Sequence, residues 1–556
     1  MKKRNHYIFC IMVSAVFWLF FSFTGETYIS SDNTQVAIII NGLFGSPLSQ
    51  YQHPLLCLSI NALSILLPSS DVYTLTVHIF IFLELVVLLL IISERPFQKP
   101  IRKCELNDYL LIMFSVLTAA FLSAGLKLWQ ANYTMQAASF LLTGWVVLFY
   151  AKRSKKGWRW ITAGTIFIAL GYMLRKEAGL LFIPFIVLMI WHEVLMSEDK
   201  KAQWRALMHY MFPAIATLFA LFTSQTIFTA IEPYAGADRY NGARTAMVDF
   251  PIKTWDESFE GINNADYIAV RNWMLADTEA ITVESLETME AVGARDQYSL
   301  TFSGLQSALA DMWRIVAKTD IYVSMMIMPV LILTGFIVVT GKKWTKLAAI
   351  SGLLGAFLIL LYFTFRGRAL MHVWVLTLFA LICLEIVLLL SNKLDRKKFT
   401  AILLLVSIVL YFSAGQVIAH AKFHDFQTVL TSRVDADESA YEQTKSDDDL
   451  YLWPLWHGTI LADSWVSGEL PSAELLKHNV ALGYWTAGQP YYTAFLEQIG
   501  HPNPIRDLVE KDNVYVMSNA DYILNFLREH YGNDIDLVEA GEVNGMTAYR
   551  VVRERA

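Results

Sequence analysis

The stretch Gly25-Glu26-Thr27-Tyr28-Ile29-Ser30-Ser31-Asp32-Asn33 follows an apolar segment, residues 7–23, that is long enough to be a membrane helix. An acid a few residues beyond such a helix, on the side away from the cytoplasm, is held where a membrane-borne ligand presents its polar head group. Asp32 is therefore a candidate catalytic base. The same Ser-Ser-Asp-Asn sequence is also a good N-cap for a helix from Thr34 onward, so a purely structural role stays open.

The composition of the whole chain indicates a polytopic membrane protein. Of its 556 residues, 55% are hydrophobic and 17% are charged, which is more apolar and less charged than a soluble protein. Residues 1–23 have the basic start and apolar run of a signal peptide, but no small-residue cleavage site comes next and many further apolar segments follow. We therefore expect an uncleaved first helix.

The cysteines and the known nucleotide motifs exclude several classes. Cys10, Cys57, Cys104 and Cys383 lie in apolar or predicted cytoplasmic stretches, so neither long polar region can form a disulfide. The sequence has no paired-Cys zinc spacing and no Gly-x-x-x-x-Gly-Lys loop. It thus argues against a structural zinc site and an ATP-driven machine. It indicates no metal site and no cofactor, although a divalent metal ion is compatible with it.

Eleven apolar segments can cross about 30 Å of hydrocarbon. They are residues 7–23, 72–92, 109–126, 133–150, 158–174, 178–196, 208–231, 321–340, 347–365, 369–390 and 399–418. A shorter apolar run, residues 55–67, lies between Pro54 and Pro68. If that run crossed the membrane, the basic loops at residues 95–103 and 151–159 would face outward, against the positive-inside rule. We expect it to lie along the outer interface instead.

The predicted fold is a polytopic α-helical membrane protein of about 11 transmembrane helices with a C-terminal extracytoplasmic α/β domain. The amino terminus is then inside and the carboxy terminus outside. Residues 1–420 form the transmembrane domain, with a first outer loop at 24–71 and a large outer loop at 232–320 that contains helices near 266–276 and 282–294. Residues 421–556 form the soluble domain, with helices at 438–445 and 521–531 and strands at 450–454, 513–517, 535–539 and 547–552. The short basic inner loops suit a bacterial plasma membrane.

Two short turns break the expectation that outward loops are poor in Lys and Arg. Arg175-Lys176-Glu177 lies between the segments at 158–174 and 178–196, and Arg366-Gly367-Arg368 lies between those at 347–365 and 369–390. Ionisable groups at a membrane boundary are costly and tend to be functional. Arg also has a planar fork of donors that matches phosphate oxygens. We expect the two turns to share an anion site; the alternative is that these side chains snorkel to lipid head groups.

These features together resemble the GT-C superfamily of integral membrane glycosyltransferases, which includes the protein O-mannosyltransferases and the aminoarabinose transferases of lipid A. The matching features are Asp32 soon after the first span, His53-Pro54-Leu55-Leu56 before an interfacial helix, the many further spans and the exterior carboxy-terminal domain. The chain departs from the family in two ways. Asn33 stands where a second acid often follows, and Leu55 replaces the second proline of the motif.

The resemblance implies transfer of a sugar from a polyprenyl-phosphate-linked donor to a glycan, lipid or protein acceptor at the outer membrane face, with no nucleic-acid partner. It implies that Asp32 takes the proton from the acceptor hydroxyl. The donor phosphate would be bound by Arg175, Lys176, Arg366 and Arg368, and the substrate pocket would include Glu26, His53 and Glu177.

Three other functions remain open from the sequence. A polysaccharide polymerase or ligase of the O-antigen type also uses exterior arginines, but such proteins usually lack a folded carboxy-terminal domain. A flippase or transporter of lipid-linked sugars would favour paired half-repeats and broken helices, which the sequence does not display. The third is a non-catalytic envelope scaffold that displays its acidic domain, and the exterior arginines make it less favoured.

Overall fold

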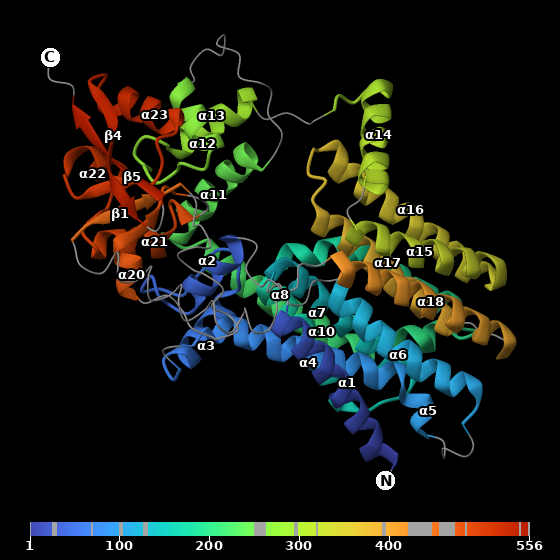
Figure 1. Cartoon of the computed structure of the whole chain (residues 1–556). Helices are drawn as coiled ribbons and strands as arrows, with labels where there is room; N and C mark the ends of the chain where they lie inside the picture. The colour runs from blue at the N-terminus through green and yellow to red at the C-terminus, as the bar shows by residue number, and fades with distance from the viewer. Residues whose placement is uncertain are drawn as a thin grey trace.

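A bundle of long helices carries a smaller mixed α/β body at one end (Figure 1). This computed structural model describes residues 2–24, 31–67, 70–98, 104–125, 132–249, 263–293, 298–318, 321–391, 396–420, 448–454, 473–483, 486–543 and 546–553. Its bundle contains the predicted spans, and the α/β body contains the described part of the predicted soluble domain.

Helices occupy all eleven segments that the sequence predicts as spans. They are α1 (Lys2–Thr24), α4 (Val72–Ile92), α6 (Leu106–Gly125), α7 (Tyr133–Arg153), α8 (Trp158–Leu174), the 3-10 turn η2 (Lys176–Phe182) with α9 (Ile183–Leu195), α10 (Lys200–Thr229), α15 (Ile321–Thr340), α16 (Lys343–Phe365), α17 (Met371–Ser391) and α18 (Arg396–His420), with the short α5 (Glu94–Gln98) between α4 and α6. Among the described residues, seven helical stretches are long and apolar enough to cross a membrane. The fold is therefore that of a polytopic membrane protein, while the number of crossings and their orientation stay predictions.

Small residues bring α7 and α8 unusually close together. A Cβ added at Gly171 would lie 2.5 Å from the Ala137 carbonyl oxygen, and one at Gly144 would lie 2.6 Å from the Gly164 carbonyl oxygen. Glycines of this kind let two helix backbones approach each other, as is common inside membranes. The contact fixes the end of α8 beside the start of α7, which is where Arg175 follows α8.

Two short helices form the described part of the first outer loop, α2 (Ser31–Ile40) and α3 (Pro54–Ser64). Asn41 joins the loop to α4, since its Nδ2 donates to Asp71 Oδ1 at 2.9 Å and its Oδ1 accepts from Ser64 Oγ at 2.7 Å. Helix α3 has 11 residues, too few to cross a bilayer. Leu58, 52% exposed, leaves an apolar face on this helix, as the predicted interfacial position requires.

The large outer loop contains more helix than the sequence predicts. Its helices are α11 (Tyr234–Val248), α12 (Asn264–Arg271), α13 (Val283–Gly293) and α14 (Phe302–Lys318). Helices α12 and α13 match the two predicted ones. Helices α11 and α14 are additional to the two predicted helices.

The C-terminal body is built on a five-stranded sheet of order β2-β1-β3-β5-β4. Its strands are β1 (Leu450–Trp453), β2 (Asn479–Ala481), β3 (Val514–Val516), β4 (Ile535–Val543) and β5 (Met546–Arg553), and its helices include α20 (Ala473–His478), α21 (Pro490–Gln498), α22 (Pro504–Glu510) and α23 (Asp521–Tyr531). Strand β1 is parallel to β2 and β3, whereas β5 is antiparallel to β3 and β4. The four predicted strands and the helix at 521–531 are confirmed, β2 was missed, and the helix predicted at 438–445 lies outside the described residues.

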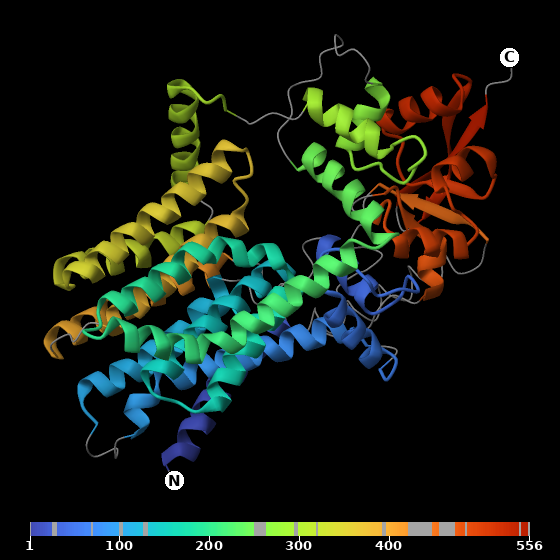
Figure 2. The same cartoon turned by 180° about the vertical axis from the view of Figure 1, so that it is seen from behind.

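The sheet continues into the large outer loop, so the C-terminal body and the α11–α13 part of that loop pack together. The backbone N–H groups of Leu275 and Ala276 both donate to the Leu482 carbonyl oxygen at 2.9 Å. Asp277 accepts from Asn503 Nδ2 at 3.0 Å and from the Tyr531 hydroxyl. In Figures 1 and 2 the green helices α11 to α13 lie against the orange and red body.

The same body also packs on the first outer loop. Phe44 contacts three aromatic rings of α21, with ring centroids 6.2 Å from Tyr491, 5.5 Å from Tyr492 and 4.8 Å from Phe495. Aromatic pairs at such distances add to the apolar burial. The C-terminal body therefore packs on the first outer loop and on the α11–α13 part of the large outer loop, although the domain division at residue 420 itself stays a prediction.

Candidate functional site

His53 fixes the first outer loop against the transmembrane helices. Its backbone N–H donates to the Met173 carbonyl oxygen at 2.8 Å, beside the end of α8. Its Nδ1 accepts from the backbone N–H of Leu55, and its Nε2 lies 3.1 Å from the Leu221 carbonyl oxygen and 3.0 Å from Ser224 Oγ. Burial lowers the pKa of His53, so at neutral pH the ring is neutral and carries its proton on Nε2. His53 therefore positions the loop.

Arg175 connects three parts of the outer face. Its Nη1 donates to Thr134 Oγ1 at 2.7 Å, at the start of α7. Its guanidinium carbon lies 5.0 Å from the ring centre of Tyr133 and 5.9 Å from that of Tyr51 in the first outer loop. The side chain stays 26% exposed. Thr134 and the two aromatic rings thus orient the guanidinium, which stays partly exposed.

Lys176 and Glu177 are more exposed than Arg175. Glu177 lies 3.9 Å from both Arg175 Nε and Lys176 Nζ, with 47% of its side chain exposed. Exposed pairs at that distance are weak. Glu177 thus makes a weak electrostatic contact with the two cations. Its role in a substrate pocket stays a prediction.

The second basic turn has a defined helix-terminating geometry. Gly367 has φ 76°, its N–H donates to the Thr364 carbonyl oxygen, and the N–H of Arg368 donates to the Phe363 carbonyl oxygen. This pair of bonds is the Schellman arrangement, which requires a residue with positive φ and so favours glycine. Arg366 forms the C-cap of α16, and the turn projects Arg368 toward the large outer loop.

Arg368 forms an ion pair with that loop. Its Nη2 lies 3.0 Å from Asp249 Oδ2, and each side chain is 25% exposed. Asp249 is the C-cap of α11. The guanidinium of Arg368 stays partly exposed in this pair.

The second basic turn leads directly into α17, which begins at Met371. Arg175 and Arg368 both lie within electrostatic range of His372, in the first turn of α17. The two arginines are therefore near the same end of the helix bundle, and Arg175 lies beside the first outer loop. His372 could not be recognised from the sequence, because nothing but its position after the Arg366–Arg368 turn distinguishes it.

A third arginine lies close to this region and carried no signal in the sequence. Arg244 of α11 is 2% exposed, and its Nη2 donates to the Tyr51 hydroxyl at 2.8 Å. Tyr51 therefore contacts Arg175 through its ring and Arg244 through its hydroxyl. Arg244 was missed because its place in the large loop depends on how that loop folds back over the first one.

The predicted base lies on α2. Asp32 is in the first turn of this helix, which begins at Ser31, so the helix starts earlier than the N-cap interpretation predicts. An acid in the first turn is favoured by the helix dipole. The side chain of Asp32 and the whole of Glu26 lie outside the described part of the structure. Their roles as base and pocket residue stay predictions.

Two carboxyl groups inside the bundle have polar partners. Glu84 Oε1 accepts from Ser139 Oγ and from Thr143 Oγ1, both at 2.6 Å. Glu385 accepts from the Thr334 hydroxyl. Such hydrogen bonds offset the cost of placing a polar group at membrane depth, so both acids have a structural explanation.

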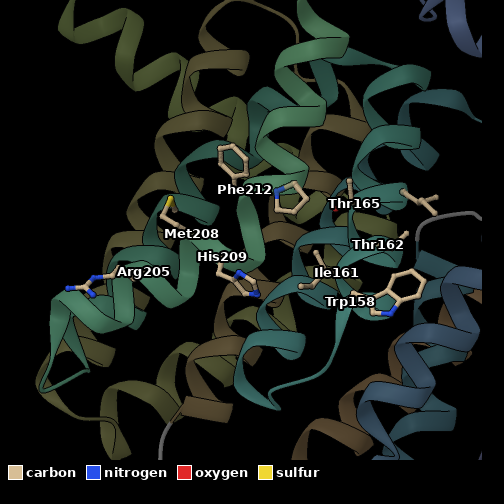
Figure 3. Close-up of a pocket in the computed structure, with 10 residues that line it drawn as sticks. Trp158, Ile161, Thr162, Thr165, Arg205, Met208, His209 and Phe212 are labelled. Atoms are coloured by element: carbon tan, nitrogen blue, oxygen red, sulfur yellow. The ribbon is translucent and has the colours of Figure 1, made fainter.

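A groove with a volume of about 680 Å³ opens elsewhere, between α8 and α10 (Figure 3). It is lined by Trp158 and Ile161 of α8 and by Met208 and His209 of α10. These α8 residues lie at the opposite end of the helix from Arg175, so the groove is separate from the predicted site. Within the described ranges, no group of three or more His, Cys, Asp or Glu side chains can hold a metal ion.

Comparisons with known proteins give one distant likeness. No family model matches the chain, and no curated protein matches it. The crystal structure of the Archaeoglobus fulgidus oligosaccharyltransferase, in complex with Zn and sulfate, is similar over 92% of this chain and 67% of that chain, with 10% identity and a TM-score of 0.39. At that identity and TM-score the likeness carries no argument about activity.

Proposed function

We propose that this protein is a membrane glycosyltransferase that moves a sugar from a polyprenyl-phosphate-linked donor to an acceptor at the outer face of the membrane. The observation that supports the proposal best is that Arg175 and Arg368 both lie within electrostatic range of His372, with Arg175 beside Tyr51 of the first outer loop. Two accessible guanidinium groups at the ends of membrane helices suit the phosphate of a lipid whose tail stays in the bilayer.

In this proposal the arginines stabilise the leaving group. The bond between the anomeric carbon and the phosphate oxygen breaks, and Arg175 and Arg368 take up the negative charge that collects on the departing lipid phosphate. Donors that are already oriented, as Thr134 orients Arg175 and Asp249 orients Arg368, lose little by reorganisation. Each hydrogen bond to the charged phosphate contributes about 1.5–3 kcal/mol. Lys176 and Arg366 add positive charge around the same lipid head group.

Asp32 supplies the base in this scheme. It accepts the proton of the acceptor hydroxyl while the acceptor oxygen bonds to the anomeric carbon. Glu26 is the other nearby carboxylate in the same loop and would contact the sugar or the acceptor. His53 holds the loop that carries both acids against α8 and α10.

Sugar transfer by membranes that contain the Asp32→Asn variant tests this function. With a radiolabelled polyprenyl-phosphate sugar as donor, we expect the variant to lose transfer by roughly 10²–10⁴-fold, the range for a positioned base, while the protein still inserts and folds. Asp238→Asn is the matched control, since Asp238 is an exposed acid on α11, and it should transfer at the wild-type rate. Undiminished transfer by Asp32→Asn would remove Asp32 from the mechanism.

A further inference from the structure

Arg244 is a buried cation whose hydrogen bonds to described residues all go to neutral groups. Nη2 donates to the Tyr51 hydroxyl at 2.8 Å, to Thr245 Oγ1 at 3.1 Å and to Asn241 Oδ1. The guanidinium carbon also lies 5.2 Å from the ring centre of Trp273. No carboxylate of the described chain forms an ion pair with it. A buried charge without a counter-charge is costly, so the site favours a bound anion.

Unused hydrogen-bonding groups surround the same side chain. Within the described residues, the Nε of Arg244 and the hydroxyls of Tyr240 and Tyr491 are buried and have no hydrogen-bond partner. Tyr240 is 6% exposed and Tyr491 1% exposed. Both tyrosines lie within electrostatic reach of Arg244. Buried polar groups in native proteins are normally paired, so an unpaired guanidinium nitrogen with two unpaired phenols in its electrostatic range indicates a place for a ligand.

The groups come from four separate segments of the outer face. Tyr51 belongs to the first outer loop, Tyr240 and Arg244 to α11, Trp273 to the turn after α12, and Tyr491 to α21 of the C-terminal body. Trp273 has φ 64°, a conformation that is strained for a bulky residue and that is maintained here by its surroundings. The arrangement exists only because the C-terminal body packs on both loops.

We propose that Arg244, Tyr240 and Tyr491 bind an anionic sugar, through a carboxylate or phosphate on Arg244 and through sugar hydroxyls on the two tyrosines. The Arg244 guanidinium matches an oxyanion, the phenols can donate to or accept from hydroxyl groups, and the nearby aromatic rings offer apolar faces. The inference rests on the proposed function, in which this ligand is the acceptor. Tyr51 then separates the acceptor anion on Arg244 from the donor phosphate on Arg175.

Thermal unfolding of the purified full-length protein with soluble probes tests this site without a transfer assay. The probes are glucuronate and glucose phosphate, with glucose and inorganic phosphate as the neutral and sugar-free comparisons. We expect both anionic sugars to raise the Tm of the wild type, because a ligand that binds only the folded state stabilises it. We expect glucose to leave the Tm unchanged and inorganic phosphate to raise it less. If only glucuronate raises the Tm, the anionic group that Arg244 binds is a carboxylate. If only glucose phosphate raises it, that group is a phosphate.

Two variants then separate binding from folding. Arg244→Gln should lose the shift with the anionic sugars, and Tyr491→Phe, which removes only the hydroxyl, should reduce it. Because Arg244→Gln also removes the hydrogen bonds to Tyr51, Thr245 and Asn241, the shift of each variant is measured against its own Tm without probe. Arg239→Gln, the same change at an exposed position of α11, should keep the full shift. A shift that persists in Arg244→Gln, or no shift with either anionic sugar in the wild type, would overturn the inference.

The Arg175→Gln variant distinguishes failure of the Arg244 site from failure of the proposed donor site. If Arg175→Gln lowers sugar transfer but keeps the Tm shift with anionic sugars, both proposals stand. If Arg175→Gln abolishes the Tm shift and Arg244→Gln does not, the probes bind at the basic turns, and the Arg244 site is refuted while the proposed function stands.

Discussion

Arg175 lies between the last turn of α8 and η2, and its side chain depends on neighbours from other parts of the chain. Thr134 accepts its hydrogen bond, and the rings of Tyr133 and Tyr51 lie beside its charge. A planar guanidinium can make such contacts with one face and one edge, and the Arg175 side chain stays 26% exposed. A lysine ammonium at the same position has no planar face or edge.

Substitutions of Arg175 should therefore show how much of its effect on sugar transfer comes from its positive charge and how much from the planar shape of the guanidinium. We expect Arg175→Gln to lower transfer by about 10- to 100-fold, the loss of one or two hydrogen bonds to a charged group. We expect Arg175→Lys to recover only part of the activity. The measurement is the initial rate of sugar transfer at equal protein level. Arg159→Gln, at the exposed opposite end of α8, is the control, and full activity of Arg175→Gln would show that this arginine binds no donor.

At the scale of elements, a single glycine allows the sheet to meet the large outer loop. Gly483 follows β2 with φ 135°, and a Cβ there would lie 2.4 Å from the backbone nitrogen of Leu275. The same segment receives the two hydrogen bonds that the loop donates to the Leu482 carbonyl oxygen. Only glycine fits this position without displacing the loop.

Gly483→Ala should loosen the loop from the C-terminal body. The strained backbone alone costs about 1–3 kcal/mol, and the contact with Leu275 adds to that cost. We expect a lower Tm and faster proteolysis within residues 263–293. Gly541→Ala is the control, because Gly541 also has a positive φ, 150°, but open space around its Cβ position. Equal effects of the two changes would mean that the Gly483 contact contributes nothing.

The ion pair between α23 and α12 makes the same interface sensitive to pH. The hydrogen bond to Asp266 raises the pKa of His530. A raised folded-state pKa stabilises the protein fully below the unfolded value, about 6.5, and this stabilisation is lost as the pH rises through the folded-state pKa. We expect the Tm to fall over that range, and His530→Gln to flatten the slope. His478→Gln, a change in the same body, is the control and should leave the slope of Tm against pH unchanged. An unchanged slope in His530→Gln would show that the His530–Asp266 pair does not cause the pH dependence.

For the whole molecule, the account requires that both outer loops and the C-terminal body face away from the cytoplasm. Cysteine labelling with a membrane-impermeant maleimide checks this in intact cells. We expect Arg239→Cys on α11 to react from outside and Lys200→Cys at the start of α10 to react only after lysis, with Cys104 replaced by Ser in both. The other three cysteines are buried. The reverse pattern would invert the topology.

The sequence predicted the helices of the bundle well because an apolar run of sufficient length has one stable form in a membrane. It also located Arg175 and Arg368, whose charge violates a topological rule that holds for short loops. It could not locate Arg244, Tyr51 or Asp249, because their contacts form between segments far apart in the chain. Strand β2 begins at Asn479, directly after α20 ends at His478, so no turn residue in the sequence marks its start.

A structure of the protein with a polyprenyl-phosphate sugar bound would test the central claim most directly. We expect the lipid phosphate within hydrogen-bonding distance of Arg175 and Arg368, and the Asp32 carboxylate on the opposite side of the anomeric carbon. A phosphate bound away from both arginines, or an Asp32 carboxylate directed into solvent with no sugar near it, would contradict the account.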